Sequence, residues 1–147
     1  MKKIYHLKTC STCQRILSQF NLEQFELQDI KTEPITEEQI DQMKEMSGSY
    51  ESLFSRRAMK YRGMGLHEMK LGEDDYKRYI LEEYTFLKRP VIIIEGQIFV
   101  GNSAGSAIAG VLQMKDKFKP DDVVVVLFHD HGSRYVGKMF NDDWMRE

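Results

Sequence analysis

The sequence predicts an α/β fold for roughly its first two-thirds, and three observations support this prediction. A β-favouring run at 3–7 leads into a helical pattern that starts at Cys10. An alternating apolar and polar run follows at 25–30, as in a half-buried strand. Finally, a continuous apolar run at 91–94 is joined by a Glu-Gly turn to a second short run at 97–100, which predicts a β-hairpin.

Helices are predicted between these strands. The first is expected to end at Asn21. Its apolar residues lie on one face at helical spacing: Cys13, Ile16, Leu17 and Phe20. Thr36 and Gln39 fit a capping box at the start of a second helix. A short helix is expected at 50–57, and a longer one at 73–87, where an acidic first turn favours the helix dipole. This order of elements is the one that a thioredoxin-like fold with a helical insertion produces.

Composition indicates an ordinary globular chain. Its 147 residues suffice for one domain with a hydrophobic core, and 41% are hydrophobic while 30% are charged. The formal net charge of −2 gives no reason to expect nucleic acid or an anionic membrane as a partner. No apolar run has the length of a signal peptide or a membrane span, so a cytoplasmic location and no membrane contact are expected.

The chain has two cysteines, Cys10 and Cys13. A disulfide scaffold would need more of them, so the spacing indicates a redox dithiol or half of a metal site. A cysteine at a helix N-terminus is held more easily as the nucleophilic thiolate, since unpaired N–H groups carry partial positive charge. Cys10 is therefore the expected attacker, and Cys13, one turn later, the group that resolves a mixed disulfide. His6 and Arg15 are candidates to add positive charge nearby.

Two other interpretations of the cysteine pair stay open. A zinc site would need further ligands, which only His129 and His131 could supply, in a spacing that matches no usual pattern. We therefore expect no metal. The second alternative is a pair of inert thiols.

Several short segments occur in an order typical of one family: Ile4-Tyr5-His6, Cys10-Ser11-Thr12-Cys13, Leu53 to Arg57, Gly65-Leu66 and Lys88-Arg89-Pro90-Val91. Through them, residues 1–102 resemble the arsenate reductase/Spx family of thioredoxin-fold proteins. The resemblance implies an arsenate reductase-like thioredoxin fold with a helical insertion over this domain.

The resemblance also implies roles for single residues. Cys10 would be the nucleophile with His6 beside it, Arg89 would bind an anionic substrate, and Pro90 would follow a cis peptide bond near the active site. Arsenate-reducing members place three arginines around the anion, as several fixed donors offset its charge. Here Arg89 matches one of them, and Arg56 is the neighbour of the residue at a second position. We expect Arg56 to help bind substrate, with a solvated helix face as the alternative.

The C-terminal part of the chain resembles a different family, the cystathionine β-synthase/cysteine synthase enzymes. Three segments carry this second resemblance: 99–106, 122–128 and a group between Ser133 and Met145. The serine matching Ser103 contacts pyridoxal phosphate in that family. A pyridoxal enzyme also needs a Schiff-base lysine and a phosphate-binding loop, which that family places far upstream and this chain lacks. We therefore expect no pyridoxal phosphate, and interpret Ser103 as a helix N-cap.

These observations predict a C-terminal extension at 103–147 that consists of a helix and a strand. The helix at 104–114 would replace the last helix of the reductase fold. The apolar run at 123–128 is expected to form a buried strand, which could join two copies of the chain into a homodimer. Because the two resemblances overlap at 97–102, this strand is the expected seam of a fusion.

The sequence thus predicts a thiol–disulfide oxidoreductase that reduces a small oxyanion or disulfide substrate. It would use no cofactor beyond an external thiol donor such as thioredoxin or glutathione with glutaredoxin. The alternative is an Spx-like regulator that binds RNA polymerase and uses the disulfide as a switch. A third interpretation is a non-functional fusion.

Overall fold

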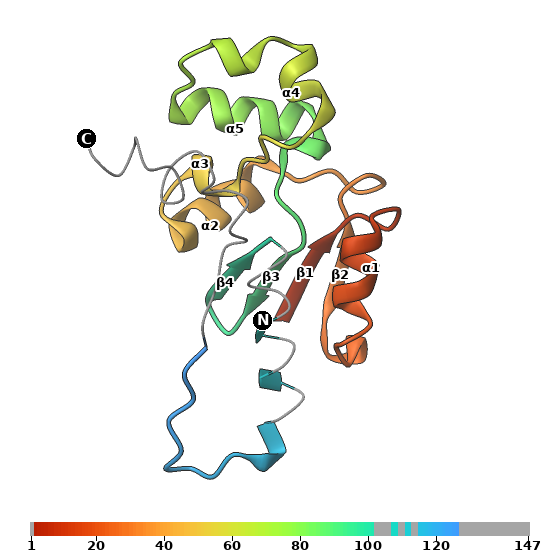
Figure 1. Ribbon diagram of the computed structural model, residues 1–147, viewed down its shortest axis with the longest axis vertical. Coiled ribbons are helices and arrows are strands. Elements are labelled where there is room, and N and C mark those ends of the chain that lie inside the picture. Colours follow the sequence, from red (N-terminus) through yellow and green to blue (C-terminus); the bar gives the residue numbers. More distant parts are fainter. Residues whose placement is uncertain (1, 102–106, 109–110, 113–114, 127–147) are drawn as a thin grey trace, which may run out of the picture.

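A mixed four-stranded sheet with helices on both faces forms the core of the chain (Figure 1). The computed structural model describes residues 2–101, 107–108, 111–112 and 115–126. The elements follow in this order: β1 Lys2–His6, α1 Ser11–Leu17, β2 Glu26–Asp29, α2 Glu37–Ser47, α3 Tyr50–Leu53, α4 Met59–Gly63, α5 Glu73–Glu82, β3 Val91–Ile94 and β4 Gln97–Val100. The predicted α/β class and all four core strands are confirmed.

The strand order β2-β1-β3-β4 places β1 and β3 at the centre of the sheet. β1 is parallel to β2 and antiparallel to β3, and β3 and β4 form the antiparallel hairpin. Tyr5 of β1 lies opposite Val91 of β3. The end of β1 and the start of β3 therefore lie at the same end of the sheet, which is where the candidate site is formed.

Alternation along the strands divides the core between the two faces of the sheet. Ile4 and Ile92 point to one face, where they pack with Ile16 and Leu17 of α1. Neighbouring residues, such as Tyr5 and Val91, point to the other face and pack with buried residues of α2, α3 and α5. Because both faces are covered, β3 is apolar throughout, and Ile4 and Tyr5 of β1 are fully buried.

The insertion between β2 and β3 supplies helices α2 to α5, drawn in orange to green in Figure 1. The capping box at α2 is present as predicted: the Thr36 hydroxyl accepts from the Gln39 N–H at 3.2 Å, and the Gln39 side chain accepts from the Thr36 N–H at 3.1 Å. Gly48 ends the helix with φ 90°, a left-handed conformation that glycine adopts without steric cost.

Two of the predicted helices are shorter than expected. α1 stops at Leu17 instead of Asn21, whose side chain begins a 3₁₀ turn by accepting from the Glu23 N–H. α3 ends at Leu53, before the expected Arg57. There Phe54 forms a bridge with Leu87, so the chain leaves the helix to pair with a distant segment.

The third long helix also ends early. α5 stops at Glu82, whereas the sequence predicted helix to residue 87. Glu83 is extended, and its carboxylate accepts from the Thr85 N–H to begin a 3₁₀ turn at Tyr84–Phe86. This turn carries the chain back toward the sheet before β3.

The C-terminal extension differs from its prediction. Residues 107–108 and 111–112 are helical, as expected, while Ser103 and the rest of that helix lie outside the described residues. Residues 123–126 do not form a strand, and Val123 and Val125 are 90% and 86% exposed. The prediction of a buried strand is therefore wrong for these four residues, since no neighbouring strand pairs with them in the described part of the chain. In Figure 1 this blue segment runs clear of the sheet.

Candidate active site around Cys10 and Cys13

The turn between β1 and α1 holds Cys10 in a fixed position. Cys10 is the N-cap residue of α1, with an extended backbone, and its N–H donates to the Leu7 carbonyl at 3.0 Å. Its own carbonyl accepts the first helical bond, from the Gln14 N–H at 3.0 Å. The Gln14 side chain closes the turn by donating to the Lys8 carbonyl at 2.8 Å. These hydrogen bonds fix the loop before α1, and the first N–H groups of the helix lie beside the cysteine.

The two cysteines have different environments. Cys10 is partly exposed, whereas Cys13 is completely buried, and neither is in a disulfide. Burial raises the pKa of Cys10, but hydrogen bonds from the Cys13 backbone and side chain and from the Thr12 N–H, together with the charge of Arg89, outweigh it and lower the pKa overall. Cys10 is therefore the accessible and more acidic thiol.

Cys13 has the opposite shift. Burial raises its pKa to about 11, and a negative charge on Cys10 adds to the rise, against the opposing effects of the Leu7 backbone and Arg89. Cys13 thus keeps its proton and donates a hydrogen bond to the Cys10 thiolate. The arrangement therefore places a more acidic thiol, suited to attack, one helical turn from a thiol that stays protonated.

Arg89 is brought to the cysteines by the sheet. It precedes β3, whose start lies beside the end of β1, and the Arg89–Pro90 peptide bond is cis, the isomer that the family resemblance implies. Its Nη1 donates to the carbonyls of Thr85 and Leu87 at 3.0 and 3.2 Å, which fixes the guanidinium. Its Nε is buried and has no hydrogen-bond partner among the described residues. A fixed cation with an unused donor can hold an anionic group near Cys10.

Arg56, the second predicted substrate-binding residue, lies in a different environment. Its Nη2 donates to the Glu51 carboxylate at 2.6 Å and to the Tyr76 hydroxyl at 3.0 Å, and its side chain is 56% exposed. Its charge is not among the principal influences on the pKa of Cys10. Among the described residues, Arg56 is therefore bound to side chains of α3 and α5 and is not brought together with the cysteines.

His6 ends β1 and is paired in register with Asp29 of β2. Burial lowers its pKa, Asp29 partly opposes this, and Lys8 lowers it further. The imidazole is therefore mainly neutral at pH 7, because its ordinary pKa is already near 6.5. The lowered pKa does not favour a positive charge on His6 beside Cys10, and that role stays a prediction.

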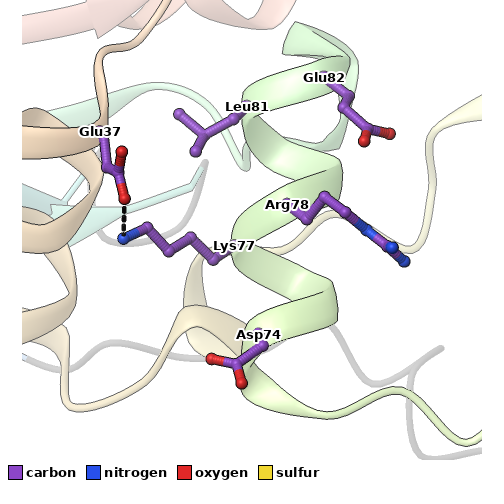
Figure 2. A pocket seen from close by; sticks show the side chains of 6 residues that line it. All are labelled: Glu37, Asp74, Lys77, Arg78, Leu81 and Glu82. Carbon is purple, nitrogen blue, oxygen red and sulfur yellow. Dashed lines mark hydrogen bonds and ion pairs between the residues drawn. The ribbon is translucent and has the colours of Figure 1, made fainter.

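The described residues offer no other obvious site. They contain no group of three or more potential metal-ligating side chains, and His129 and His131 lie outside them. A surface hollow of about 360 Å³ is lined by residues of α2 and α5, and Figure 2 shows their side chains: Glu37, Asp74, Lys77, Arg78, Leu81 and Glu82. Lys77 pairs with Glu37 and Asp41 at 2.8 Å, so its charge is compensated within the helices. Likewise, no described helix is long and apolar enough to span a membrane.

Comparison with known families agrees with this geometry. The profile of the ArsC family matches residues 5–107, more than half of the chain. The chain belongs to the ArsC family. The matched range includes every predicted site residue from His6 to Pro90, and membership supports a thiol-based redox function at the level of the family.

Several solved structures show the same fold. A provisionally assigned arsenate reductase from Yersinia pestis aligns with a TM-score of 0.64 and 15% identity, covering 74% of this chain and 98% of that protein. An arsenate reductase from Vibrio cholerae gives 0.58 and 18%, over 66% and 86%. SACOL0876 from Staphylococcus aureus gives 0.56 and 24%, over 69% and 90%. The predicted thioredoxin-like architecture is thereby confirmed.

Several groups at this ArsC-type site could not be predicted from residue types. The carbonyls of Thr85 and Leu87 hold Arg89, and the Thr12 N–H stabilises the Cys10 thiolate. Backbone groups are present at nearly every position, so no sequence pattern indicates them. Gln14 could only have been suspected from its place on the first turn of α1.

Proposed function

We propose that this chain is a thiol–disulfide oxidoreductase in which Cys10 attacks the substrate and Cys13 resolves the adduct. The observation that carries the proposal is the geometry of the pair: Cys10 is accessible at the N-cap of α1, and Cys13 is buried one turn later. In these positions the pKa of Cys10 is lowered and that of Cys13 is raised to about 11. Two inert thiols in a core would both be expected to have raised pKa values.

With a disulfide substrate, the reaction proceeds by two exchanges. The Cys10 thiolate attacks one substrate sulfur, a mixed disulfide forms, and the other substrate sulfur leaves as a thiolate. Cys13 then loses its proton to solvent and attacks the Sγ of Cys10, which releases the second substrate thiolate. The substrate gains two electrons, and the chain is left with a Cys10–Cys13 disulfide.

The influences on the pKa of Cys13 support this order of steps. The negative charge of Cys10 and its hydrogen bond both raise the pKa of Cys13. Both disappear when Cys10 enters a mixed disulfide, while the charge of Arg89, which lowers the pKa, remains. The first chemical step therefore removes two of the influences that raise the pKa of the resolving thiol, while burial, the largest, persists.

The substrate we propose is a small disulfide with an anionic group near the reacting sulfur, held by Arg89. A free oxyanion such as arsenate carries several charged oxygens and is bound best by several fixed donors. In the described residues Arg89 is fixed beside the cysteines, whereas Arg56 is paired with Glu51. An external thiol donor, either thioredoxin or glutathione with glutaredoxin, would restore the dithiol in a reducing cytoplasm.

The test uses the purified, reduced full-length chain with oxidised glutathione and with arsenate as separate substrates. Thiol release from glutathione, together with a Cys10–Cys13 disulfide found by mass spectrometry, is the expected result. Alkylation of Cys10 across pH should show a midpoint below that of an ordinary cysteine. The proposal would be falsified if Cys10 titrated as an ordinary thiol and no intramolecular disulfide formed. Disulfide formation without turnover, and co-purification with RNA polymerase, would instead favour the regulator.

A further inference from the structure

Among the described residues, an apolar segment at 123–126 and the outer edge of β4 both lack a strand partner. Residues 123–126 are four consecutive valines, and Val123 and Val125 are 90% and 86% exposed. β-branched residues favour strands, yet this segment has no strand partner in the described part of the chain. Exposed apolar runs of this kind mark interaction surfaces.

The edge of the sheet at β4 is the matching feature. β4 is the last strand in the order β2-β1-β3-β4, so one side of its backbone faces away from β3. The Gly101 N–H donates to the Pro90 carbonyl at 2.8 Å, and Gln97 lies opposite Ile94 at the hairpin turn. Since hydrogen bonding alternates along an antiparallel pair, the backbone groups of Ile98 and Val100 point outward.

The two edges of the sheet are not equivalent. β2, at the other edge, carries the charged residues Glu26 and Asp29, which discourage pairing with another strand. β4 has no charged residue, and its sequence Gln-Ile-Phe-Val is as long as the valine segment. The open edge at β4 is therefore the one that an added apolar strand fits.

We propose that residues 123–126 of one copy pair as a strand with the outer edge of β4 in a second copy, and that two copies exchange this segment reciprocally. Each copy carries one segment and one edge in equal number, so the exchange closes as a symmetric dimer. The segment stands clear of its own sheet in Figure 1, and 22 residues separate Val100 from Val123, enough chain to reach a neighbour. Pairing would satisfy the outward groups of Ile98 and Val100 and cover the valines.

The test combines light scattering over a concentration series with amide hydrogen exchange. Wild type is expected to reach twice the chain mass of 17.3 kDa, with slow exchange at Ile98 and Val100. Val125→Lys places a charge at a site that is exposed in the single chain, so it should leave the fold intact, return the mass to that of one chain and speed exchange at those two amides. Met59→Lys is the matched control, since Met59 is 94% exposed on α4, and it should remain dimeric.

Each of four results would overturn the proposal. They are a monomeric wild type at all concentrations, a dimer that Val125→Lys leaves unchanged, open-ended oligomers instead of a closed pair, and protection at β2 instead of β4. None of these results bears on the thiol chemistry proposed above, which is read out separately by alkylation and turnover.

Discussion

The exposed Cys10 and the buried Cys13 differ in pKa although they are close in sequence. Cys10 and Cys13 are three residues apart, yet the pKa of one is lowered and that of the other is raised to about 11. Both are buried to some extent and both feel Arg89. The difference arises because the Cys10 sulfur receives hydrogen bonds from Thr12 and Cys13, while burial dominates at Cys13. Local donors, and not residue type, decide which thiol attacks.

The most direct test of this difference between the two thiols is to remove the exposed one. Cys10→Ser should reduce turnover of oxidised glutathione by about 10³-fold or more, because the nucleophile is lost. Cys13 cannot substitute for it, since it is fully buried and protonated at neutral pH. Release of reduced glutathione measures the effect. Substantial remaining activity would show that Cys13 can attack substrate by itself.

Removing the buried thiol should have a different consequence. Cys13→Ser is expected to lose multiple turnover but to keep the first step, so a stable mixed disulfide between Cys10 and glutathione accumulates. Intact-protein mass spectrometry would detect one added glutathione per chain. If the variant instead turns over as fast as wild type with thioredoxin as the donor, Cys13 is not the resolving residue.

Arg89 and Arg56 allow a matched test of the charge that lowers the pKa of Cys10. Arg89→Gln should raise the alkylation midpoint of Cys10, because a favourable charge near the thiolate disappears. Arg56→Gln should leave that midpoint unchanged and cost at most about 1 kcal/mol of stability, as expected for an exposed ion pair with Glu51. Equal shifts in the two variants would mean that Arg56 also acts on the site.

The raised pKa of Cys13 predicts a loss of stability in alkali. The unfolded thiol ionises at its lower ordinary pKa, whereas the folded one holds its proton to a pKa of about 11. The unfolded state therefore loses protons first as the pH rises, and the free energy of unfolding falls between these two values. Urea unfolding at a series of pH values measures this fall. In Cys13→Ser the part of the fall due to this thiol should be absent.

His6 should have the smallest effect. Its lowered pKa makes it mainly neutral at pH 7, so His6→Asn is expected to leave the alkylation midpoint of Cys10 unchanged at neutral pH. Rates of alkylation with a small reagent would reveal any shift. A clear rise in the midpoint would restore the positive role that the sequence had suggested for this histidine.

Much of the fold could be predicted because its signals are local. Alternation identified β2, a continuous apolar run identified β3, and the Thr36–Gln39 capping box identified the start of α2. Helix ends were harder, since α3 stops where Phe54 pairs with Leu87, far away in the sequence. Such a contact leaves no periodic signal.

The site was predicted in part for the same reason. Cys10, Cys13 and Arg89 were identified by spacing and by family resemblance, and the structure brings them together. The roles expected of His6 and Arg56 depend on their surroundings. Asp29 lies beside His6 through the pairing of β1 with β2, and Tyr76 hydrogen-bonds to Arg56. Residue types alone do not reveal these contacts between distant segments.

The antiparallel pairing of β1 with β3 has a consequence for the protein during its synthesis. Both cysteines leave the ribosome early, whereas Arg89 follows only after α2 to α5 have been made. Until β3 pairs with β1, a nascent chain lacks the cation that lowers the pKa of Cys10. Cys10 therefore lacks this charge while the chain is incomplete, and completion of the central sheet supplies one of the influences that lower its pKa.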